Sequence, residues 1–252
     1  MDKTSLSSTA TNRPIPLINA SLYRTFWQVL DWIYPPLCAG CGKEGYRFCP
    51  ACEESISYLI SNLCTTCGQP LLGRGSSLCK SCLENPPVFH AIRSVAVYEN
   101  SIREALLKMK FHQDFGISEY FGYKCAELLV TLNWKFDLII PIPLSKQRRK
   151  FRGFNQAYRL ALPISLTFAK PICENGLVRN IDTQIQADLP REKRLINVNG
   201  AFLANQDLVQ GKRILLVDDI ATTSATMNGC STELLAKHAA CVMGITVARA
   251  VL

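Results

Sequence analysis

The sequence predicts an α/β domain with a mainly parallel sheet flanked by helices, preceded by a small metal-binding module. Three observations lead to this prediction. Eight cysteines form four Cys-x-x-Cys pairs between residues 38 and 82. From about residue 89, apolar runs of strand length alternate with amphipathic helical patterns, and this alternation is typical of parallel α/β folds. One of these strands, at 213–217, leads directly into two aspartates and a loop rich in hydroxyl side chains.

Composition restricts the class of protein. The chain has 252 residues, a net charge of +8 and twelve cysteines. The basic balance suits phosphate-bearing partners, although an ordinary scatter of solvated lysines and arginines would give the same charge. The N-terminus lacks a signal-peptide pattern and no apolar run is long enough to span a membrane, so we expect a cytoplasmic protein. Cysteines rarely form a disulfide framework there, so their spacing must explain them.

The N-terminal segment precedes the cysteines. Residues 1–20 contain a stretch rich in Ser, Thr, Asn and Pro, and we expect a disordered tail. Residues 21–37 contain apolar residues at helical spacing and end in a Pro-Pro pair, which predicts a helix. Arg24 is the only base on this helix, whereas membrane-surface helices are rich in Lys and Arg. We therefore expect it to pack on a neighbouring domain.

The cysteines of residues 38–87 form an internal repeat. Each copy has a Cys-x-x-Cys-Gly pair followed by a second Cys-x-x-Cys pair. A two-residue gap lets both thiolates of a pair bind one metal ion, and four thiolates around one ion are typical of a structural zinc site. The repeat predicts a double zinc ribbon with two Zn²⁺ ions. The expected ligands are Cys38, Cys41, Cys49 and Cys52 in the first site, and Cys64, Cys67, Cys79 and Cys82 in the second.

Two alternatives remain for the cysteines. The pairs of the two copies could interleave, and an iron–sulfur cluster could replace zinc, although paired two-residue knuckles suit zinc better. Four thiolates leave no open coordination position, so we expect no catalysis at either site. Few large apolar residues lie between the cysteines. Metal binding should therefore supply much of the free energy with which this module folds.

Residues 88–252 should form the α/β domain. A sequence rich in Gln and charged residues at 182–199 predicts a loop or flap over a site. The expected strands are 91–98, 136–142, 213–217 and 241–248, and the expected helices are 102–111, 118–132, 155–168 and 225–237.

The stretch after the strand at 213–217 suits a phosphorylated sugar. Asp218 and Asp219 follow the strand, where carboxylates can accept hydrogen bonds from sugar hydroxyls or hold hydrated Mg²⁺. The loop amides and hydroxyls can hold a phosphate at the positive end of the next helix. Helix capping alone would explain one aspartate, but not two together with four hydroxyls. The loop residues are Thr222, Thr223, Ser224, Ala225 and Thr226.

A basic segment, which we expect to form a loop, follows the strand at 136–142. Five bases, including Arg148 and Arg152, lie within residues 146–152. Ligands bind at the ends of strands in open parallel sheets, and guanidinium groups bind phosphate oxygens bidentately. The segment could hold a pyrophosphate, or a single-stranded nucleic acid with the help of Phe151 and Phe154. The remaining alternative is a solvated basic loop.

The string Val217-Asp-Asp-Ile-Ala-Thr-Thr-x-x-Thr226 resembles the phosphoribosyl pyrophosphate (PRPP) motif of type I phosphoribosyltransferases. The resemblance implies that Asp218 and Asp219 bind the ribose hydroxyls and act in catalysis, while the loop from Thr222 to Thr226 binds the 5′-phosphate. Mg²⁺ would accompany PRPP, and Arg148 and Arg152 would stabilise the pyrophosphate. The family usually has Gly where Ser224 stands, and Ser restricts the backbone there.

Further strings narrow the resemblance. Pro141-Ile-Pro-Leu, the Arg148-x3-Arg152-Gly-Phe-Asn-Gln string and the string from Gln186 to Phe202 look like the ComF/GntX family. Its members join four-cysteine zinc modules to a phosphoribosyltransferase-like domain.

This second resemblance implies a competence protein for DNA uptake and natural transformation. Its partners would be PRPP or a related phosphoribosyl ligand, single-stranded DNA and proteins of the competence machinery. The alternative is an active phosphoribosyltransferase of nucleotide metabolism. The resemblance does not identify its acceptor.

Overall fold

The computed structural model describes residues 25, 29, 32–33, 35–71, 73, 75–111, 114–180 and 200–251. The expected tail at 1–20, most of the expected helix within 21–37 and the expected loop at 182–199 lie outside these residues. Among the described residues, no helix is both long and apolar enough to cross a membrane.

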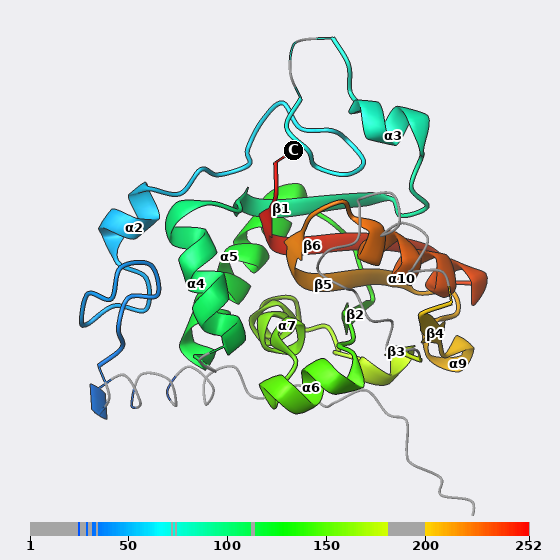
Figure 1. Ribbon diagram of the computed structural model, residues 1–252. Coiled ribbons are helices and arrows are strands. Elements are labelled where there is room, and N and C mark those ends of the chain that lie inside the picture. Colours follow the sequence, from blue (N-terminus) through cyan, green and yellow to red (C-terminus); the bar gives the residue numbers. More distant parts are fainter. Residues whose placement is uncertain are drawn as a thin grey trace, which may run out of the picture.

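A parallel four-stranded sheet forms the centre of the fold (Figure 1), with the strand order β1-β6-β5-β2. All three strand pairs are parallel, which confirms the predicted α/β class. A separate antiparallel pair, β3 and β4, lies beside it. The strands are β1 (Ala91–Val97), β2 (Leu138–Pro141), β3 (Leu177–Arg179), β4 (Phe202–Ala204), β5 (Arg213–Ala221) and β6 (Cys241–Arg249).

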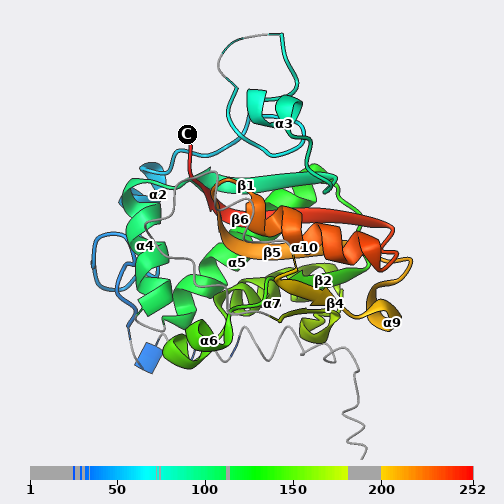
Figure 2. The same ribbon diagram turned by 45° about the vertical axis from the view of Figure 1, so that its right-hand side comes forward.

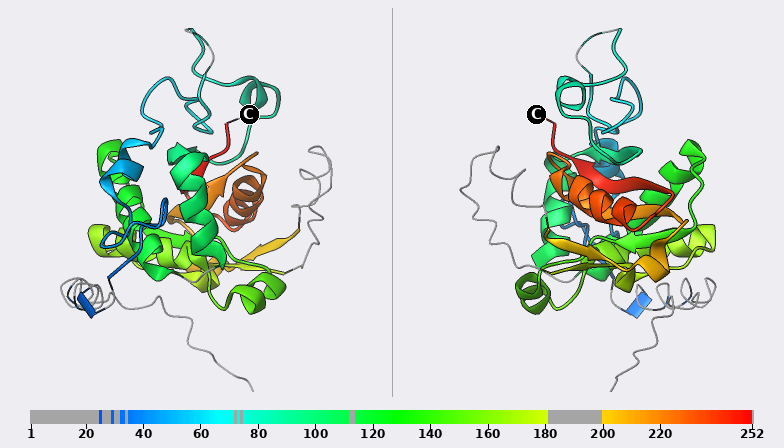
Figure 3. Two further views of the ribbon diagram at one scale, coloured as in Figure 1. Left: turned by 60° about the vertical axis from the view of Figure 1, so that its left-hand side comes forward. Right: turned by 90° about the vertical axis from the view of Figure 1, so that its right-hand side faces the viewer.

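Helices cover both faces of the sheet. Helices α4, α5 and α7 share one apolar cluster with the sheet, while α10, β3 and β4 share the other. Figure 3 shows α4 and α5 on one side of the sheet and α10 on the opposite side. The helices are α2 (Pro50–Glu54), α3 (Lys80–Glu84), α4 (Asn100–Phe111), α5 (Phe115–Leu132), α6 (Lys146–Arg152), α7 (Gln156–Phe168), η1 (Glu174–Gly176), α9 (Gln206–Val209) and α10 (Ala225–Ala236).

The central strand β5 explains why both faces need a cover. Successive side chains of a strand point to opposite faces. Leu215 and Val217 accordingly belong to the cluster with α4, α5 and α7, while Ile214 and Leu216 belong to the cluster with α10. All four are fully buried. The continuous apolar run is therefore that of a strand buried on both faces.

The two cysteine repeats fold alike. We call residues 37–54 the first ribbon and residues 63–84 the second ribbon. Each begins with an isolated β-bridge and ends in a short helix, α2 or α3, that starts after a ligand cysteine. In each, the glycine after the first pair donates its N–H to the first cysteine's carbonyl, at 2.8 Å for Gly42 and 2.9 Å for Gly68. The structure thus confirms the internal repeat.

The ribbons pack at different places on the α/β domain (Figure 2). The first ribbon lies against α5, where Phe48 contacts Tyr120 and Phe121 at ring-centroid distances of 5.3 and 5.5 Å. Arg47 forms a 2.6 Å ion pair with buried Glu119 on the same helix. The second ribbon lies near β1 and α10, and its buried cysteines belong to the α10-side cluster. Each ribbon therefore extends a different half of the core.

Backbone hydrogen bonds join the ribbon module to the outer edge of β1. Thr66 accepts from the Ile92 N–H at 2.7 Å. The segment between the ribbons adds two bonds, from the Leu59 N–H to the Val95 carbonyl at 3.0 Å and from the Val97 N–H to the Ser57 carbonyl at 2.9 Å. Three backbone groups on this edge of β1 therefore find partners in residues 57–66.

Two expectations need correction. Residues 146–152 form a helix, α6, and not a loop: the Ser145 hydroxyl accepts from the Arg148 N–H at 3.2 Å, and Gly153 ends the helix at φ 76°. Strand β5 continues to Ala221, beyond the expected end at 217, because its backbone keeps pairing with β6. Neighbouring strands thus override the local polarity of the acidic pair.

Candidate functional site

The carboxyl ends of the parallel strands bring the candidate residues together. Asp218 and Asp219 lie near the end of β5. The basic helix α6 follows β2, which pairs with β5 on one side, and Arg249 ends β6, which pairs with β5 on the other. This edge is where ligands bind in open parallel sheets. The topology therefore places the predicted acidic and basic groups at one edge.

Asp219 has two partners that come from separate helices. Its Oδ2 lies 3.1 Å from Lys110 Nζ, at the end of α4, and accepts a hydrogen bond from Gln156 Nε2 of α7 at 3.3 Å. The exposed fraction of the side chain is 8% for Asp219 and 17% for Lys110. A buried carboxylate needs such partners to remain charged. The ion pair therefore holds Asp219 in one orientation.

Asp218 has different surroundings. Burial, together with the neighbouring Asp219 carboxylate, raises the pKa of Asp218 to about 8. Its Oδ1 accepts from the Asp219 N–H at 2.8 Å. Two adjacent carboxylates in one strand resist being charged together. A ligand that donates hydroxyl protons or brings a cation would favour ionised Asp218.

The loop after β5 turns sharply at Ser224. This residue has φ 62° and ψ 10°, in the left-handed region, and α10 begins directly after it. Side chains make this backbone conformation unfavourable for residues other than Gly, which explains why the resembling motif usually has Gly here. Thr222 is exposed, and Thr223 and Thr226 are partly exposed. The first-turn amides of α10 and these hydroxyls can together hold an anion.

Helix α6 brings part of the basic segment to the acidic pair. The Arg152 guanidinium lies over the Phe111 ring at 5.8 Å. Burial lowers the pKa of Arg152, while Asp219 and Asp218 oppose this shift by their negative charge. Arg148 is exposed, as are Arg149 and Lys150. Arg152 is therefore the base of this segment that the structure brings near the acidic pair, whereas the others face solvent.

A cavity of about 930 Å³ lies between the loop and the second ribbon. Thr222, Thr223, Ser224 and Ala225 line one side, and residues of the second ribbon line the other. Arg249 also contributes to its wall. The candidate phosphate loop thus borders the metal-binding module, a neighbourhood that the sequence did not reveal.

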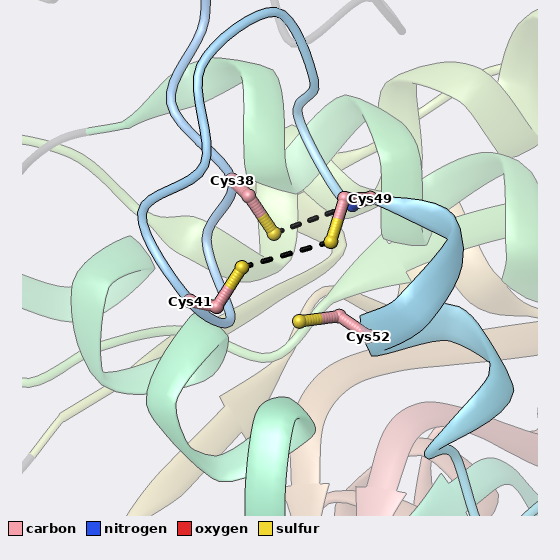
Figure 4. Close-up of side chains that lie close together, drawn as sticks. All are labelled: Cys38, Cys41, Cys49 and Cys52. Carbon is pink, nitrogen blue, oxygen red and sulfur yellow. Dashed lines mark hydrogen bonds between the residues drawn. The ribbon is translucent and has the colours of Figure 1, made fainter.

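The first four-cysteine group is the one that the repeat predicts (Figure 4). The sulfur atoms of Cys38, Cys41, Cys49 and Cys52 all lie within 4.8 Å of one another. Burial opposes ionisation of Cys38, but backbone N–H groups of Cys49, Cys41 and Gly40 outweigh it and lower the pKa of Cys38 to about 6. Four converging thiols with donors aimed at the sulfur suit a tetrahedral zinc ion.

The second group repeats this arrangement. Cys64, Cys67, Cys79 and Cys82 also lie within 4.8 Å of one another. Burial is again outweighed by backbone N–H groups, which lower the pKa of Cys64 to about 6. Each copy therefore makes its own site, and the interleaved alternative is wrong.

Sequence reasoning missed two residues at the site. Gln156 ends the string that begins at Arg148, yet nothing in its spacing indicated a contact with Asp219. Arg249 lies near the C-terminus and belongs to no motif, but it is 3% exposed and reaches both Gln69 and Ser224. The only sequence signal for Arg249 was its position as a charged residue at the end of an apolar strand.

Comparisons with known proteins agree with this organisation. Residues 29–83 match the double zinc ribbon domain family. The chain is 28% identical over 215 residues to the competence protein ComFC of Bacillus subtilis, covering 82% of this chain and 86% of that protein. It is 26% identical over 205 residues to competence protein F of Haemophilus influenzae, covering 77% and 82%. It is 28% identical over 204 residues to the DNA utilization protein YhgH of Escherichia coli K12, covering 78% and 88%.

Two solved structures match part of the chain. The allosteric regulatory enzyme of purine biosynthesis is 20% identical, with a TM-score of 0.37 over 52% of this chain and 26% of that chain. Glutamine PRPP amidotransferase from B. subtilis is 21% identical, with a TM-score of 0.36 over 51% of this chain and 25% of that chain. This chain thus spans about a quarter of either structure.

The fold and the metal sites define a class of protein. It joins a double zinc ribbon, with two structural zinc sites, to an α/β domain built on a parallel four-stranded sheet. The relatives agree with the more specific resemblance: over most of its length the chain is similar to proteins named as competence and DNA utilization proteins.

Proposed function

We propose that this protein acts in the uptake or use of DNA and that its α/β domain binds a phosphoribosyl ligand, with Mg-PRPP as the candidate. The relatives named as competence and DNA utilization proteins support the first part. The second part is supported chiefly by one observation: β5 carries Asp218 and Asp219 straight into a left-handed turn at the N-terminus of α10. We also propose that the exposed face of α6 holds single-stranded DNA.

The residues have distinct tasks in this proposal. Asp218 and Asp219 accept hydrogen bonds from ribose hydroxyls, and the ion pair with Lys110 orients Asp219. The loop from Thr222 to Thr226 donates amide and hydroxyl protons to the 5′-phosphate. Mg²⁺ supplies positive charge to the pyrophosphate when it is bound. Arg152 lies near the acidic pair and adds a second positive group for that pyrophosphate.

The proposal for DNA depends on charge and exposure. Arg148, Arg149 and Lys150 are exposed on α6, and Phe151 between them and Arg152 has an exposed fraction of 76%. An exposed aromatic among bases offers a stacking surface and phosphate contacts, the combination that binds single strands without sequence preference.

Calorimetry with Mg-PRPP tests the ligand site. We expect heat of binding with the wild type and an affinity at least about tenfold lower in the Asp218→Asn/Asp219→Asn variant, since two carboxylate acceptors are lost. Asp207→Asn is a matched control because Asp207 lies in α9, outside the candidate site. Absence of heat with the wild type would refute the phosphoribosyl proposal.

Salt titration tests the DNA site. Single-strand affinity should fall steeply with salt and should drop in Arg148→Ala/Arg149→Ala, because these bases release counterions from the phosphates. Phe151→Ala should weaken binding with little change in the salt slope. Lys212→Ala/Arg213→Ala removes two bases near the opposite end of β5 and should bind as the wild type does. Binding that is independent of salt, or equal in both double variants, would contradict the proposal.

The enzyme alternative has a separate readout. Release of pyrophosphate from Mg-PRPP in the presence of nucleobases would indicate transfer. Ligand binding without release would support a sensor or a binding domain, and Asp218→Asn would then affect binding alone.

A further inference from the structure

Arg249 joins the second ribbon to the phosphate loop. It is the last residue of β6 and is 3% exposed. Its Nε donates to Gln69 Oε1, within the second ribbon, at 2.8 Å. Its Nη1 and Nη2 each lie 3.4 Å from Ser224 Oγ, in the loop. One buried guanidinium therefore contacts both parts of the molecule.

The second metal site supplies the negative charge that a buried arginine requires. Arg249 lies beside this site, because its Nε donates to Gln69, two residues after the ligand Cys67. A zinc ion with four thiolate ligands keeps a net negative charge, which attracts the guanidinium. Arg93 also lies beside the site, since its Nη1 is 3.5 Å from the Cys64 carbonyl. The second ribbon is thus flanked by two basic groups.

The guanidinium has more donors than the described residues satisfy well. A guanidinium carries five N–H groups. Gln69 takes one at a short distance, and the terminal nitrogens share the Ser224 hydroxyl at 3.4 Å. Buried donors normally have closer partners. Arg249 and the loop residues Thr222 and Thr223 line the same cavity. An anion bound in this cavity could therefore accept hydrogen bonds from the Arg249 guanidinium.

The metal holds the other end of this contact in place. Gln69 follows the knuckle formed by Cys64 and Cys67, and its carbonyl accepts from the Cys64 N–H at 2.8 Å. The knuckle is also fixed to β1 by the bond from Ile92 to Thr66 at 2.7 Å. Loss of the shared metal ion would remove both the orientation of Gln69 and the charge that attracts Arg249.

We propose that Arg249 is an anion-binding residue of the 222–226 loop, held in position by the metal-bound second ribbon, so that zinc and a phosphate-bearing ligand increase each other's affinity. Such linkage is reciprocal by thermodynamic necessity. The inference rests on the proposed role of the loop in holding phosphate. It adds a side chain that belongs to no sequence motif and gives the second ribbon a part in ligand binding.

The test uses the full-length zinc-loaded protein and two matched variants, Arg249→Gln and Arg93→Gln. Each variant removes a base beside the second metal site. Only Arg249 contacts Ser224 of the loop, whereas Arg93 contacts the carbonyls of Cys64 and Ile92. The probe is inorganic phosphate, and its binding is monitored by hydrogen exchange of the backbone amides of residues 222–226. We expect phosphate to protect these amides in the wild type and in Arg93→Gln, with about tenfold weaker binding in Arg249→Gln.

Linkage provides the second readout. In the wild type, phosphate should slow the loss of one of the two zinc ions to a chelator, and this effect should vanish in Arg249→Gln. Equal phosphate affinity in Arg249→Gln and the wild type would overturn the proposal. So would an equal loss in Arg93→Gln, because the effect would then come from charge near the metal and not from contact with the loop.

Two outcomes need separation. If the wild type binds phosphate at the loop but not Mg-PRPP, the proposed function fails while the role of Arg249 stands. If Arg249→Gln does not fold, Gln69→Ala replaces it, since this change removes the short hydrogen bond and leaves the charge. A smaller loss of phosphate affinity is then expected, and wild-type affinity in Gln69→Ala would count against the proposal.

Discussion

Asp218 and Asp219 are neighbours in one strand, yet their environments differ and give the two carboxylates different properties. Asp219 is tied to Lys110 and Gln156, which fixes its orientation. Asp218 has its pKa raised to about 8 by burial and by the Asp219 charge. Asp219 is therefore already oriented before a ligand binds, whereas Asp218 can become ionised when a ligand binds.

The raised pKa of Asp218 predicts how stability changes with pH. An unfolded aspartate has a pKa near 3.9, whereas folded Asp218 has one of about 8. Between these values the folded state binds more protons than the unfolded state, so this group lowers stability as pH rises from about 4 to about 8. Asp218→Asn removes the effect. Relative to the wild type without ligand, it should gain at least about 1.4 kcal/mol in unfolding free energy between pH 5 and pH 8.

Urea denaturation of both proteins at pH 5, 6, 7 and 8 measures this gain. Asp207→Asn, at an exposed position of α9, is the control and should follow the wild type at every pH. A constant difference between Asp218→Asn and the wild type would contradict the prediction.

Lys110 offers a second prediction at this scale. Lys110→Met leaves the buried Asp219 carboxylate without its 3.1 Å partner. Breaking a buried pair by removing one member costs about 3–5 kcal/mol, because the remaining charge is uncompensated. Lys110→Met/Asp219→Asn should recover most of this loss in a thermal or urea denaturation experiment. A double variant as unstable as Lys110→Met would show that the lysine acts mainly through packing.

At the residue scale, sequence reasoning found the acidic pair and the loop but not their partners. The pair stands out because two carboxylates after an apolar strand are chemically conspicuous. Gln156 and Arg249 approach from α7 and β6, which are far from the loop in sequence, and only the topology of the sheet brings them there. Pattern reasoning has no access to such contacts unless each residue lies in a motif of its own.

The glycines that follow the first cysteine pair of each ribbon occupy equivalent positions but have different surroundings. Gly42 and Gly68 hold the same place in the two copies and both have positive φ, 83° and 74°. A Cβ on Gly42 would meet no atom within 4 Å, whereas a Cβ on Gly68 would lie 2.7 Å from the Ile92 carbonyl oxygen. The second knuckle is pressed against β1, while the first is open on that side.

This difference predicts unequal effects of the same substitution. Gly42→Ala should cost about 1–2 kcal/mol, the strain of a left-handed alanine. Gly68→Ala adds a clash with backbone that cannot move easily, so we expect a larger loss of stability and displacement of the second ribbon from β1. Melting temperatures and zinc content of the two variants provide the comparison. Equal melting temperatures would refute the docking of the second knuckle.

At the scale of elements, most strands and helices of the α/β domain follow from apolar periodicity. Helix α6 was mistaken for a loop because its residues are charged and it lacks an apolar face, although Ser145 and Gly153 are good cap residues. Strands β3 and β4 and helix α9 were not predicted at all. Each has three or four residues, and elements this short depend on their tertiary neighbours more than on local sequence.

For the whole molecule, the ribbons are parts of the core and not appendages. Cys38, Cys49 and Cys52 belong to the cluster that includes α4 and α5, and Cys64, Cys67 and Cys82 belong to the cluster on the α10 side. The sequence predicted both metal sites, since ligand spacing is a local property. It could not predict their docking, because few apolar residues between the cysteines indicated a module that depends on metal alone.

Zinc analysis of double variants tests the grouping. Cys41→Ser/Cys49→Ser removes two ligands of the first group and should leave about one zinc ion per chain, because the second site keeps all its thiolates. Cys41→Ser/Cys67→Ser removes one ligand from each group and should release both ions. Cys125→Ala, a buried cysteine outside both groups, is the control and should keep two. Identical zinc contents in the two double variants would contradict separate sites.

The hydrogen bonds between residues 57–66 and β1 also concern how copies of this chain avoid one another. β1 ends the strand order of the sheet, and an open edge strand is a template for pairing with another molecule. Residues 57–66 shield this edge, and they are held between the two metal sites. Loss of zinc would then free the edge of β1 to pair with the strand of another copy, so we expect the metal-free protein to aggregate.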